Sequence, residues 1–371
     1  MKLAIVSTNK DKYSETFIHN HIKLLPAEIH FLFDGYLPSQ YSIDKGLTLH
    51  SIFDFNKSKL FGLLKNKTKD TSELLNEAIE NYLLKNKIEY ILCEYGPSGV
   101  EIMKIANKLK IPLIVHFHGY DAYREDILSS YGKRYKELFS FASEIIAVSE
   151  HMKLQLSKLG CPENKLHKLC YGIDTTIFRL NETKTPSPTF IACGRFVEKK
   201  GPTLTIRAFE KVVAKEPNAK LVMIGDGELL QTCKDLAIAL GINENVEFKG
   251  ALSQEQIASE FRNALAFVQH SITTKTNDSE GTPLVILEAM SSGLAVISTL
   301  HGGIPDVVSN ETGLLVKEGD VDTMAEKMLF LISNPDEAIA MGTKAAKVVA
   351  EKYSLELYIE NLWHIIEYTK F

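Results

Sequence analysis

The chain alternates between short β-rich runs and longer stretches with helical periodicity. In residues 71–85, for example, Leu74, Ala78 and Tyr82 fall on one helical stripe. The β-rich runs of the first half are residues 2–6, 29–33, 90–94, 113–117 and 145–148. This alternation predicts parallel strands with helices packed on both faces of a sheet.

The alternation stops at residues 174–188, a polar segment that contains Pro186 and Pro188 and that we interpret as a linker. At 371 residues the chain is long enough for two cores. The later β-rich runs are residues 189–193, 221–224, 246–248, 265–268, 295–298 and 314–316. We therefore predict two doubly wound α/β domains, residues 1–173 and 189–352, with residues 353–371 forming a helix that crosses back to the first domain. Open α/β sheets bind ligands at the carboxyl ends of their strands, so the expected active site is a cleft between the domains.

Composition excludes several classes of function. A net charge of -5 argues against a protein that binds duplex nucleic acid. The five cysteines are scattered and lack the paired spacing of a zinc site, which favours a reducing compartment. The sequence shows neither a signal peptide nor an apolar run long enough to span a bilayer, so we expect a cytoplasmic protein.

Residues 279–290 are the most informative stretch. Thr282 is a good N-cap and Pro283 suits a first helical position, so the predicted helix begins here with free N–H groups that form an anion site. Glu288 lies among apolar residues, where a carboxylate is costly unless donors meet it, and a ribose diol supplies two. From the residues alone, Glu288 as a cap or lysine partner and Glu280 as a simple loop acid are equally open.

The same stretch carries a resemblance to a known family. Glu280 and Glu288 are separated by seven residues, with Gly-Thr-Pro between them and Ala-Met after the second. This pattern resembles glycosyltransferase family 4, whose members are retaining enzymes of the GT-B fold. Further similar segments are the donor-diphosphate clamp at 194–201, a Gly-x-x-Glu-like turn at 302–306 and a Gly-Leu-Leu-Val motif at 312–316.

The resemblance implies roles for the donor side. Arg195 and Lys200 would neutralise the departing diphosphate, as a forked guanidinium and a point ammonium are suited to do. Lys199 is a competitor for the second role, and a surface pair beside a turn is the alternative for both. Gly194 would allow the backbone to approach a bulky anion.

The remaining donor contacts also follow from the resemblance. Glu280 would bind a hydroxyl of the transferred sugar, Glu288 the ribose and Leu252 the base. Gly225 lies in a Gly-x-Gly turn expected near the nucleotide, and because Leu230 replaces the third glycine, the nicotinamide fingerprint is incomplete. The backbone facing the sugar or phosphate would come from Gly281, Thr282, Pro283 and Leu284.

The first half carries a weaker motif. His118 and Asp121 form a His-Gly-x-Asp pattern at the end of a predicted strand. Family members often place this histidine near the donor sugar, so we predict a catalytic contact for His118 and a supporting role for Asp121. A structural histidine and a helix-capping aspartate are the alternatives.

The loop after the first strand is expected on the acceptor side. Its Ser14-Glu15-Thr16 sequence is similar to a version found in transferases that assemble capsular and exopolysaccharides. Glu15 and Thr16 would face the cleft, while Ser14 can also cap a helix. The loop departs from the Gly-Gly turn of many family members.

Residues 56–69 form a basic amphipathic segment, in which five lysines from Lys57 to Lys69 surround apolar side chains. Such a segment can rest on anionic lipid, which would suit peripheral contact with the cytoplasmic membrane face and a lipid-linked acceptor. A solvated helix edge or mobile loop is the favoured interpretation.

The resemblance implies a retaining, metal-independent hexosyltransferase without a cofactor. Its donor would be a UDP- or GDP-sugar, and its acceptor a saccharide, such as a lipid-linked intermediate in the biosynthesis of capsule, lipopolysaccharide or another surface polysaccharide. The alternatives are a nucleotide-sugar epimerase of the same fold, a non-catalytic nucleotide-sugar-binding protein and, less favoured, a nicotinamide oxidoreductase.

Overall fold

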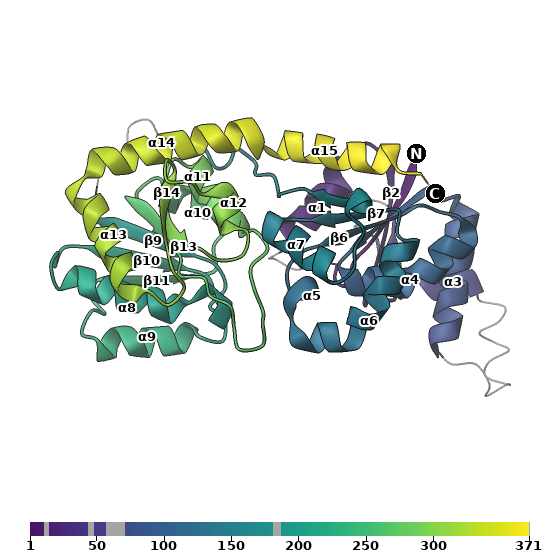
Figure 1. Ribbon diagram of the computed structural model, residues 1–371, viewed down its shortest axis with the longest axis horizontal. Coiled ribbons are helices and arrows are strands. Elements are labelled where there is room, and N and C mark those ends of the chain that lie inside the picture. The colour runs from purple at the N-terminus through teal and green to yellow at the C-terminus, as the bar shows by residue number, and fades with distance from the viewer. Residues whose placement is uncertain (11–14, 44–47, 57–70, 181–186, 371) are drawn as a thin grey trace. The chain divides into compact units, whose positions relative to one another are not determined.

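The computed structural model describes residues 1–10, 15–43, 48–56, 71–180 and 187–370 (Figure 1). The chain forms two compact units, one of Met1–Leu169 with Ile359–Phe371 and one of Cys170–Tyr358. Each unit is a helix-flanked sheet, and the α/β class predicted from the sequence is confirmed. Among the described residues, no helix is both long enough and apolar enough to cross a membrane.

The sheet of the first unit has the strand order β4-β3-β2-β1-β5-β6-β7-β8. Its strands are β1 Lys2–Val6, β2 Glu28–Phe33, β3 Gln40–Ser42, β4 His50–Ser51, β5 Tyr90–Glu94, β6 Leu113–Phe117, β7 Glu144–Ala147 and β8 Leu166–Lys168. β3 pairs antiparallel with both β2 and β4 at one end of the sheet, and the other neighbours are parallel. The strand order therefore reverses between β1 and β5, which is the switch point of this sheet.

Two glycines let α4 (Gly96–Leu109) pack closely on this sheet. A Cβ added at Gly96 would lie 2.3 Å from the Phe117 ring, and one added at Gly99 would lie 2.8 Å from Val115. These glycines let the first turn of α4 sit directly on β6. The helical elements are α1 Thr16–Leu24, η1 Ile52–Asn56, α3 Thr71–Asn86, α4 Gly96–Leu109, α5 Tyr120–Tyr123, α6 Glu125–Phe141, α7 Glu150–Lys158, η2 Glu163–Lys165 and α15 Leu355–Tyr368, whose residues from Ile359 onward belong to this unit.

The sheet of the second unit is parallel throughout, in the order β11-β10-β9-β12-β13-β14. Its strands are β9 Thr189–Cys193, β10 Lys220–Ile224, β11 Val246–Gly250, β12 Ala266–Val268, β13 Ala295–Thr299 and β14 Gly313–Val316. A parallel sheet is covered on both faces, which explains why every residue of β13 is buried. The order reverses between β9 and β12.

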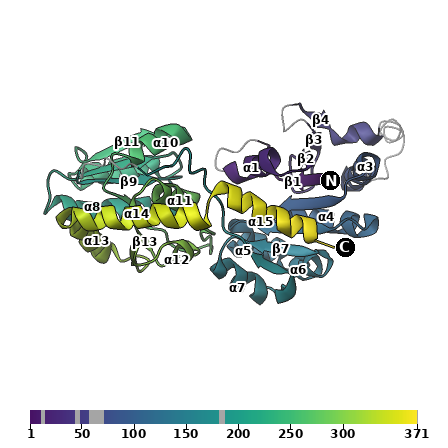
Figure 2. The same cartoon turned by 90° about the horizontal axis from the view of Figure 1, so that it is seen from above.

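Two apolar clusters hold helices on the two faces of this sheet (Figure 1). α8, α9 and α13 contribute to one cluster, while α10, α11 and α14 contribute to the other, where α11 and α14 lie side by side (Figure 2). The helical elements are η3 Glu198–Lys200, α8 Pro202–Val213, α9 Leu230–Ala239, α10 Gln254–Phe261, α11 Leu284–Ser291, α12 Ile304–Val307, α13 Val321–Ser333 and α14 Pro335–Lys352.

The start of α11 corrects one prediction. The N-cap is Pro283, not Thr282, and no side chain caps this end of the helix. The proline has φ -66° and ψ 113°, so its ring fixes the first angle while the backbone is still extended. The helix therefore begins one residue later than expected, at Leu284.

Candidate functional site

The switch point of the second sheet gathers the predicted donor residues. β9 ends at Cys193 and is followed by Gly194 and Arg195, while the neighbouring strand β12 ends at Val268 and is followed by Gln269. Arg195, Lys200, Gly194 and Gln269 line one pocket at this point. Ligands of open α/β sheets bind at this position, so the fold alone marks it as a candidate site.

Glycines allow two loops to meet here. The Gly194 N–H donates to Ile224 O (2.9 Å), and the Gly225 N–H donates to Gly250 O (2.8 Å). A Cβ at Gly225 would lie 2.0 Å from Gly194 O, and its φ of +130° also disfavours a side chain. Glycine at position 225 is thus required by the packing of the loops after β9 and β10.

The two lysines of η3 occupy different surroundings. Lys199 is buried, and its Nζ lies 3.1 Å from Asp278 Oδ1. Lys200 Nζ lies 3.1 Å from Glu280 Oε1, with the two side chains only 15% and 9% exposed. Lys200, not Lys199, therefore shares the pocket with Arg195.

The Arg195 side chain is exposed at this pocket. Within the described parts of the chain, no carboxylate forms an ion pair with its guanidinium, whereas both neighbouring lysines have one. The five N–H groups of a guanidinium suit a diphosphate, which accepts several hydrogen bonds at once.

Glu280 is a buried carboxylate with cationic neighbours. Burial alone would raise the pKa of Glu280, but Lys200, then Lys199 and His301, outweigh it and lower the pKa to about 2. Glu280 is therefore ionised at neutral pH. A buried anion that stays charged can accept hydrogen bonds from sugar hydroxyls.

Glu288 differs from Glu280 although both lie beside Lys200. Its side chain is half-buried on α11, and burial raises the pKa of Glu288 to about 7, with Lys200 opposing the shift only in part. No ion pair of Glu288 occurs in the described portion of the structure, which does not support the lysine-partner alternative. The ribose role stays a prediction.

The other donor-side residues have structural contacts. Gly303 N–H donates to Gly281 O (2.7 Å), so this carbonyl fixes the loop. Thr282 is buried. Leu252 and Leu284 pack against the apolar cluster on the α10, α11 and α14 face of the sheet. Contacts of these four residues with a donor remain predictions.

In the first unit, sequence reasoning missed the central group. Glu94 ends β5 and is fully buried; its Oε1 is hydrogen-bonded to His21 Nδ1 (2.6 Å) and its Oε2 to His118 Nε2 (2.7 Å). Burial would raise the pKa of Glu94, but the two histidines hold it well below its usual range. The sequence feature that could have indicated this group is a glutamate at the end of an otherwise largely apolar strand. His118 is thus brought into a buried polar network rather than left as a lone side chain.

A metal ion could be held by His21, Glu94 and His116, whose ligand atoms lie within 4.8 Å of one another. Two histidines and a carboxylate form a donor set typical of zinc. Both oxygens of Glu94 already accept hydrogen bonds, so a cation would have to displace the protons of these bonds. The expectation of a metal-free enzyme stays untested.

Asp121 has the capping geometry that the sequence left open. Its Oδ1 accepts hydrogen bonds from the backbone N–H groups of His118 (3.0 Å) and Gly119 (2.9 Å), and its Oδ2 accepts one from Gly96 (3.0 Å). Burial raises the pKa of Asp121 in spite of these bonds and of His118. This carboxylate holds the His118 turn against the start of α4, which supports a structural role.

On the predicted acceptor side, Glu15 is the buried N-cap residue of α1, and half-buried Thr16 is its first residue. Ser14 and the Lys57–Lys69 segment lie outside the described residues.

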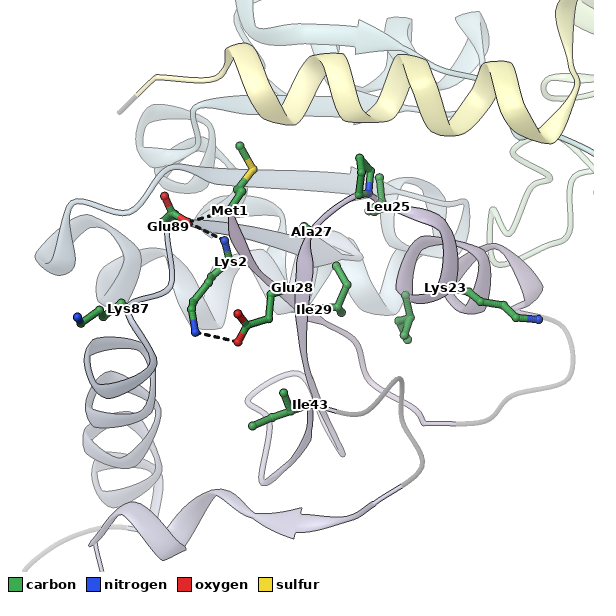
Figure 3. Close-up of a pocket in the computed structure, with 12 residues that line it drawn as sticks. Met1, Lys2, Lys23, Leu25, Ala27, Glu28, Ile29, Ile43, Lys87 and Glu89 are labelled. Carbon is green, nitrogen blue, oxygen red and sulfur yellow. Dashed lines mark hydrogen bonds and ion pairs between the residues drawn. The ribbon is translucent and has the colours of Figure 1, made fainter.

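Another pocket of the first unit lies at the amino ends of β1 and β2 (Figure 3). Lys2 Nζ donates to Glu28 Oε1 (2.8 Å), and the Lys2 N–H donates to Glu89 Oε2 (2.7 Å). These bonds tie β1 to its neighbours. None of the predicted site residues lines this pocket.

Comparisons with known proteins agree with the resemblance. The family described as "Glycosyl transferases group 1" matches residues 174–348, and "Glycosyltransferase Family 4" matches residues 57–177. The amylovoran biosynthesis glycosyltransferase AmsK of Erwinia amylovora is 28% identical over 289 residues, which cover 75% of this chain and 70% of AmsK. An uncharacterized glycosyltransferase of Methanocaldococcus jannaschii is 27% identical over 94% of this chain and 93% of its own.

Among solved structures, the Anabaena protein HepE in complex with UDP is similar over 98% of this chain and 99% of its own, with a TM-score of 0.78 and 15% identity. At this identity the likeness shows the fold alone. It confirms the predicted GT-B arrangement of two parallel-sheet α/β domains.

Proposed function

Because the chain belongs to the glycosyltransferases of the group 1 and family 4 type, we propose that it transfers a hexose-type sugar from a UDP- or GDP-sugar to a saccharide acceptor. The observation that carries this proposal is the cationic group at the second switch point. Arg195 and Lys200 line one pocket, and Lys200 also contacts the ionised Glu280. A phosphate site thus adjoins a hydrogen-bond acceptor for sugar hydroxyls.

In the proposed reaction, Arg195 and Lys200 bind the diphosphate and stabilise the negative charge that develops on the leaving group. An ammonium has three N–H donors, so Lys200 can contact Glu280 and a phosphate oxygen at once. The acceptor enters on the face of the leaving group, whose phosphate oxygen takes the acceptor proton. The product retains the donor's configuration, and the two cationic side chains act in place of a divalent ion.

The acceptor side rests on weaker support. AmsK is described as an amylovoran biosynthesis enzyme, and we propose that this chain likewise acts in the assembly of a surface polysaccharide on a lipid-linked intermediate. We assign His118, held by Glu94, to contact with the transferred sugar.

The test is a hydrolysis screen of UDP-, GDP- and ADP-sugars without acceptor, with Glu280→Gln as the matched control. We expect slow release of free sugar from one donor class by the wild-type protein only, and the anomer released first, read by NMR, reports retention. An isomerised nucleotide-sugar would favour the epimerase. Tight binding of UDP or GDP without turnover of any donor would favour the non-catalytic binder.

Glu288 provides a prediction of its own. The pKa of Glu288 is raised to about 7, and two ribose hydroxyls bind best to an ionised carboxylate, both of whose oxygens accept hydrogen bonds. Binding of UDP or GDP should therefore favour the ionised form and release protons. At pH 7 we expect wild-type protein to release about half a proton more than Glu288→Gln. The wild-type affinity should rise with pH from 6 to 8, because a raised pKa leaves the group protonated at the acid end.

Calorimetry in phosphate and Tris buffers measures this release, and subtracting the Glu288→Gln result removes the proton release of the nucleotide itself. Equal release by the two proteins would contradict the assignment of Glu288 to the ribose.

A further inference from the structure

A second histidine, outside the predicted site, contacts the Glu280 loop. His301 follows β13 and is 1% exposed. Its Nε2 accepts a hydrogen bond from the Glu280 backbone N–H (3.0 Å) and lies 3.2 Å from Ser279 Oγ. Its Nδ1 lies 2.6 Å from Glu318 Oε1. The ring therefore connects the loop before α11 to Glu318 in the loop after β14.

These contacts fix the protonation of the ring. A backbone N–H can only donate, so Nε2 of His301 must be the bare nitrogen. The proton of the neutral ring is then on Nδ1, where it is donated to Glu318. The carboxylate and the amide thus select one tautomer between them, as a partner on one ring nitrogen commonly does for the other.

Glu318 is itself fixed. Its Oε2 accepts from the Thr273 backbone N–H (2.8 Å), and its Oε1 accepts from Thr273 Oγ1 (3.3 Å). Burial would raise the pKa of Glu318, but the Thr273 and His301 hydrogen bonds lower it, so the acceptor is ionised. The loops that follow β12, β13 and β14 therefore meet at one ring.

The turn after His301 also packs closely against the backbone of the Glu280 loop. A Cβ at Gly302 would lie 2.3 Å from Glu280 O, and Gly302 has a φ of +51°. Beside it, Gly303 N–H donates to Gly281 O (2.7 Å). Gly302 therefore packs against the Glu280 carbonyl oxygen, while the His301 ring accepts a hydrogen bond from the Glu280 N–H.

We propose that His301 and Glu318 are positioning residues that hold Glu280 in its sugar-binding position, and that acidification releases it. The inference rests on the proposed function. A proton added to Nε2 turns an acceptor into a donor that faces the Glu280 N–H, so that bond is lost. The resulting imidazolium also attracts the Glu280 carboxylate, which draws it away from a sugar hydroxyl.

Other titratable groups surround the ring and need separate control. They are Glu318 and Glu280, then Lys199, Lys200 and Asp278 around Glu280, and His270 beside Glu318. The pKa of His270 is lowered to about 4 by burial, so it titrates at more acid pH than a histidine of ordinary pKa.

Two variants of similar size distinguish the hydrogen bond of His301 with the Glu280 N–H from its hydrogen bond with Glu318. His301→Gln can place its carbonyl oxygen where Nε2 lies and does not titrate, whereas His301→Asn can donate to Glu318 but is too short to reach Glu280. The proposal predicts that the rate of the wild-type protein falls at acid pH. With the donor identified by the hydrolysis screen, we expect His301→Gln to keep kcat within about threefold of the wild type and not to show this fall. We expect His301→Asn to lower kcat about tenfold, with the Kd for UDP or GDP within about twofold.

Nuclear magnetic resonance of the ¹⁵N-labelled histidines tests the tautomer on the wild-type protein without any donor. We expect His301 at pH 7.5 to show a protonated Nδ1 and a bare Nε2. A protonated Nε2 at this pH would overturn the inference, as would wild-type kcat in His301→Asn. If the wild-type protein turns over no donor, the proposed function fails and the catalytic role of His301 fails with it, while the spectrum still reports the geometry of the loop.

Discussion

Replacing Arg195 by alanine is expected to lower the rate of donor-sugar hydrolysis by about a hundred- to a thousandfold. The guanidinium is exposed at the switch-point pocket and, among the described residues, has no carboxylate partner. Its loss would therefore remove stabilisation of the leaving diphosphate without leaving an unpaired charge behind. The size of the effect is that of losing one preorganised donor to a developing anion.

The matched control is Arg207→Ala, which removes an exposed arginine from α8 in the same unit and should leave the rate unchanged. Arg195→Lys keeps the charge but not the fork, so we expect an intermediate rate. Steady-state hydrolysis of the donor identified in the screen measures all three variants, with Tm as a check on folding. Unimpaired turnover by Arg195→Ala would refute the assignment of this residue to the diphosphate.

Strand positions could be predicted closely because parallel strands are short apolar runs with sharp polar ends. β1, β5, β6 and β9 begin and end where the sequence indicates. The short strands β3, β4 and β8 were missed, because strands of two or three residues depend on pairing with a neighbour and carry little pattern of their own.

The donor side was more predictable than the network around it. Arg195, Lys200 and Glu280 belong to local motifs, and the fold brings all three to one switch point. Glu94 and His301 are single residues whose partners lie far away in the sequence: 73 positions separate Glu94 from His21, and 21 separate His301 from Glu280. Such pairs depend on tertiary packing, which no local pattern records.

Asp121 shows that a sequence motif alone does not separate a structural role from a catalytic one. The His-Gly-x-Asp pattern drew attention to its chemistry, but its two oxygens accept three backbone N–H groups and hold the turn. An aspartate that holds a turn and an aspartate that contacts a substrate can stand at the same position of the same motif. Only the partners of the oxygens separate the two roles.

Replacing Lys200 by methionine is expected to destabilise the protein by about 3 kcal/mol at pH 8, as well as to abolish measurable turnover. The change leaves the buried Glu280 carboxylate without its nearest cation, and the more distant Lys199 compensates only in part. Urea unfolding measures the loss. The exposed pair of Lys211 with Asp322 is the control, and Lys211→Met should change the free energy of unfolding far less than Lys200→Met does.

The pH dependence of this loss has a definite sign. In the wild type, the pKa of Glu280 is lowered to about 2, so its contribution to stability is complete above the ordinary value of 4.5 and is lost as pH falls toward 2. Without Lys200, burial raises this pKa, and the carboxylate then destabilises the fold as pH rises through the new value. The difference between wild type and Lys200→Met should therefore grow from pH 4 to pH 8.

The double variant Lys200→Met with Glu280→Gln separates the roles of this pair in stability and in catalysis. It removes the unpaired charge, so we expect it to recover most of the stability at pH 8 and none of the turnover. If Lys200→Met were as stable as the wild type at pH 8, the 3.1 Å contact would not be an ion pair in solution. The argument that Glu280 stays ionised to bind a sugar hydroxyl would then fail with it.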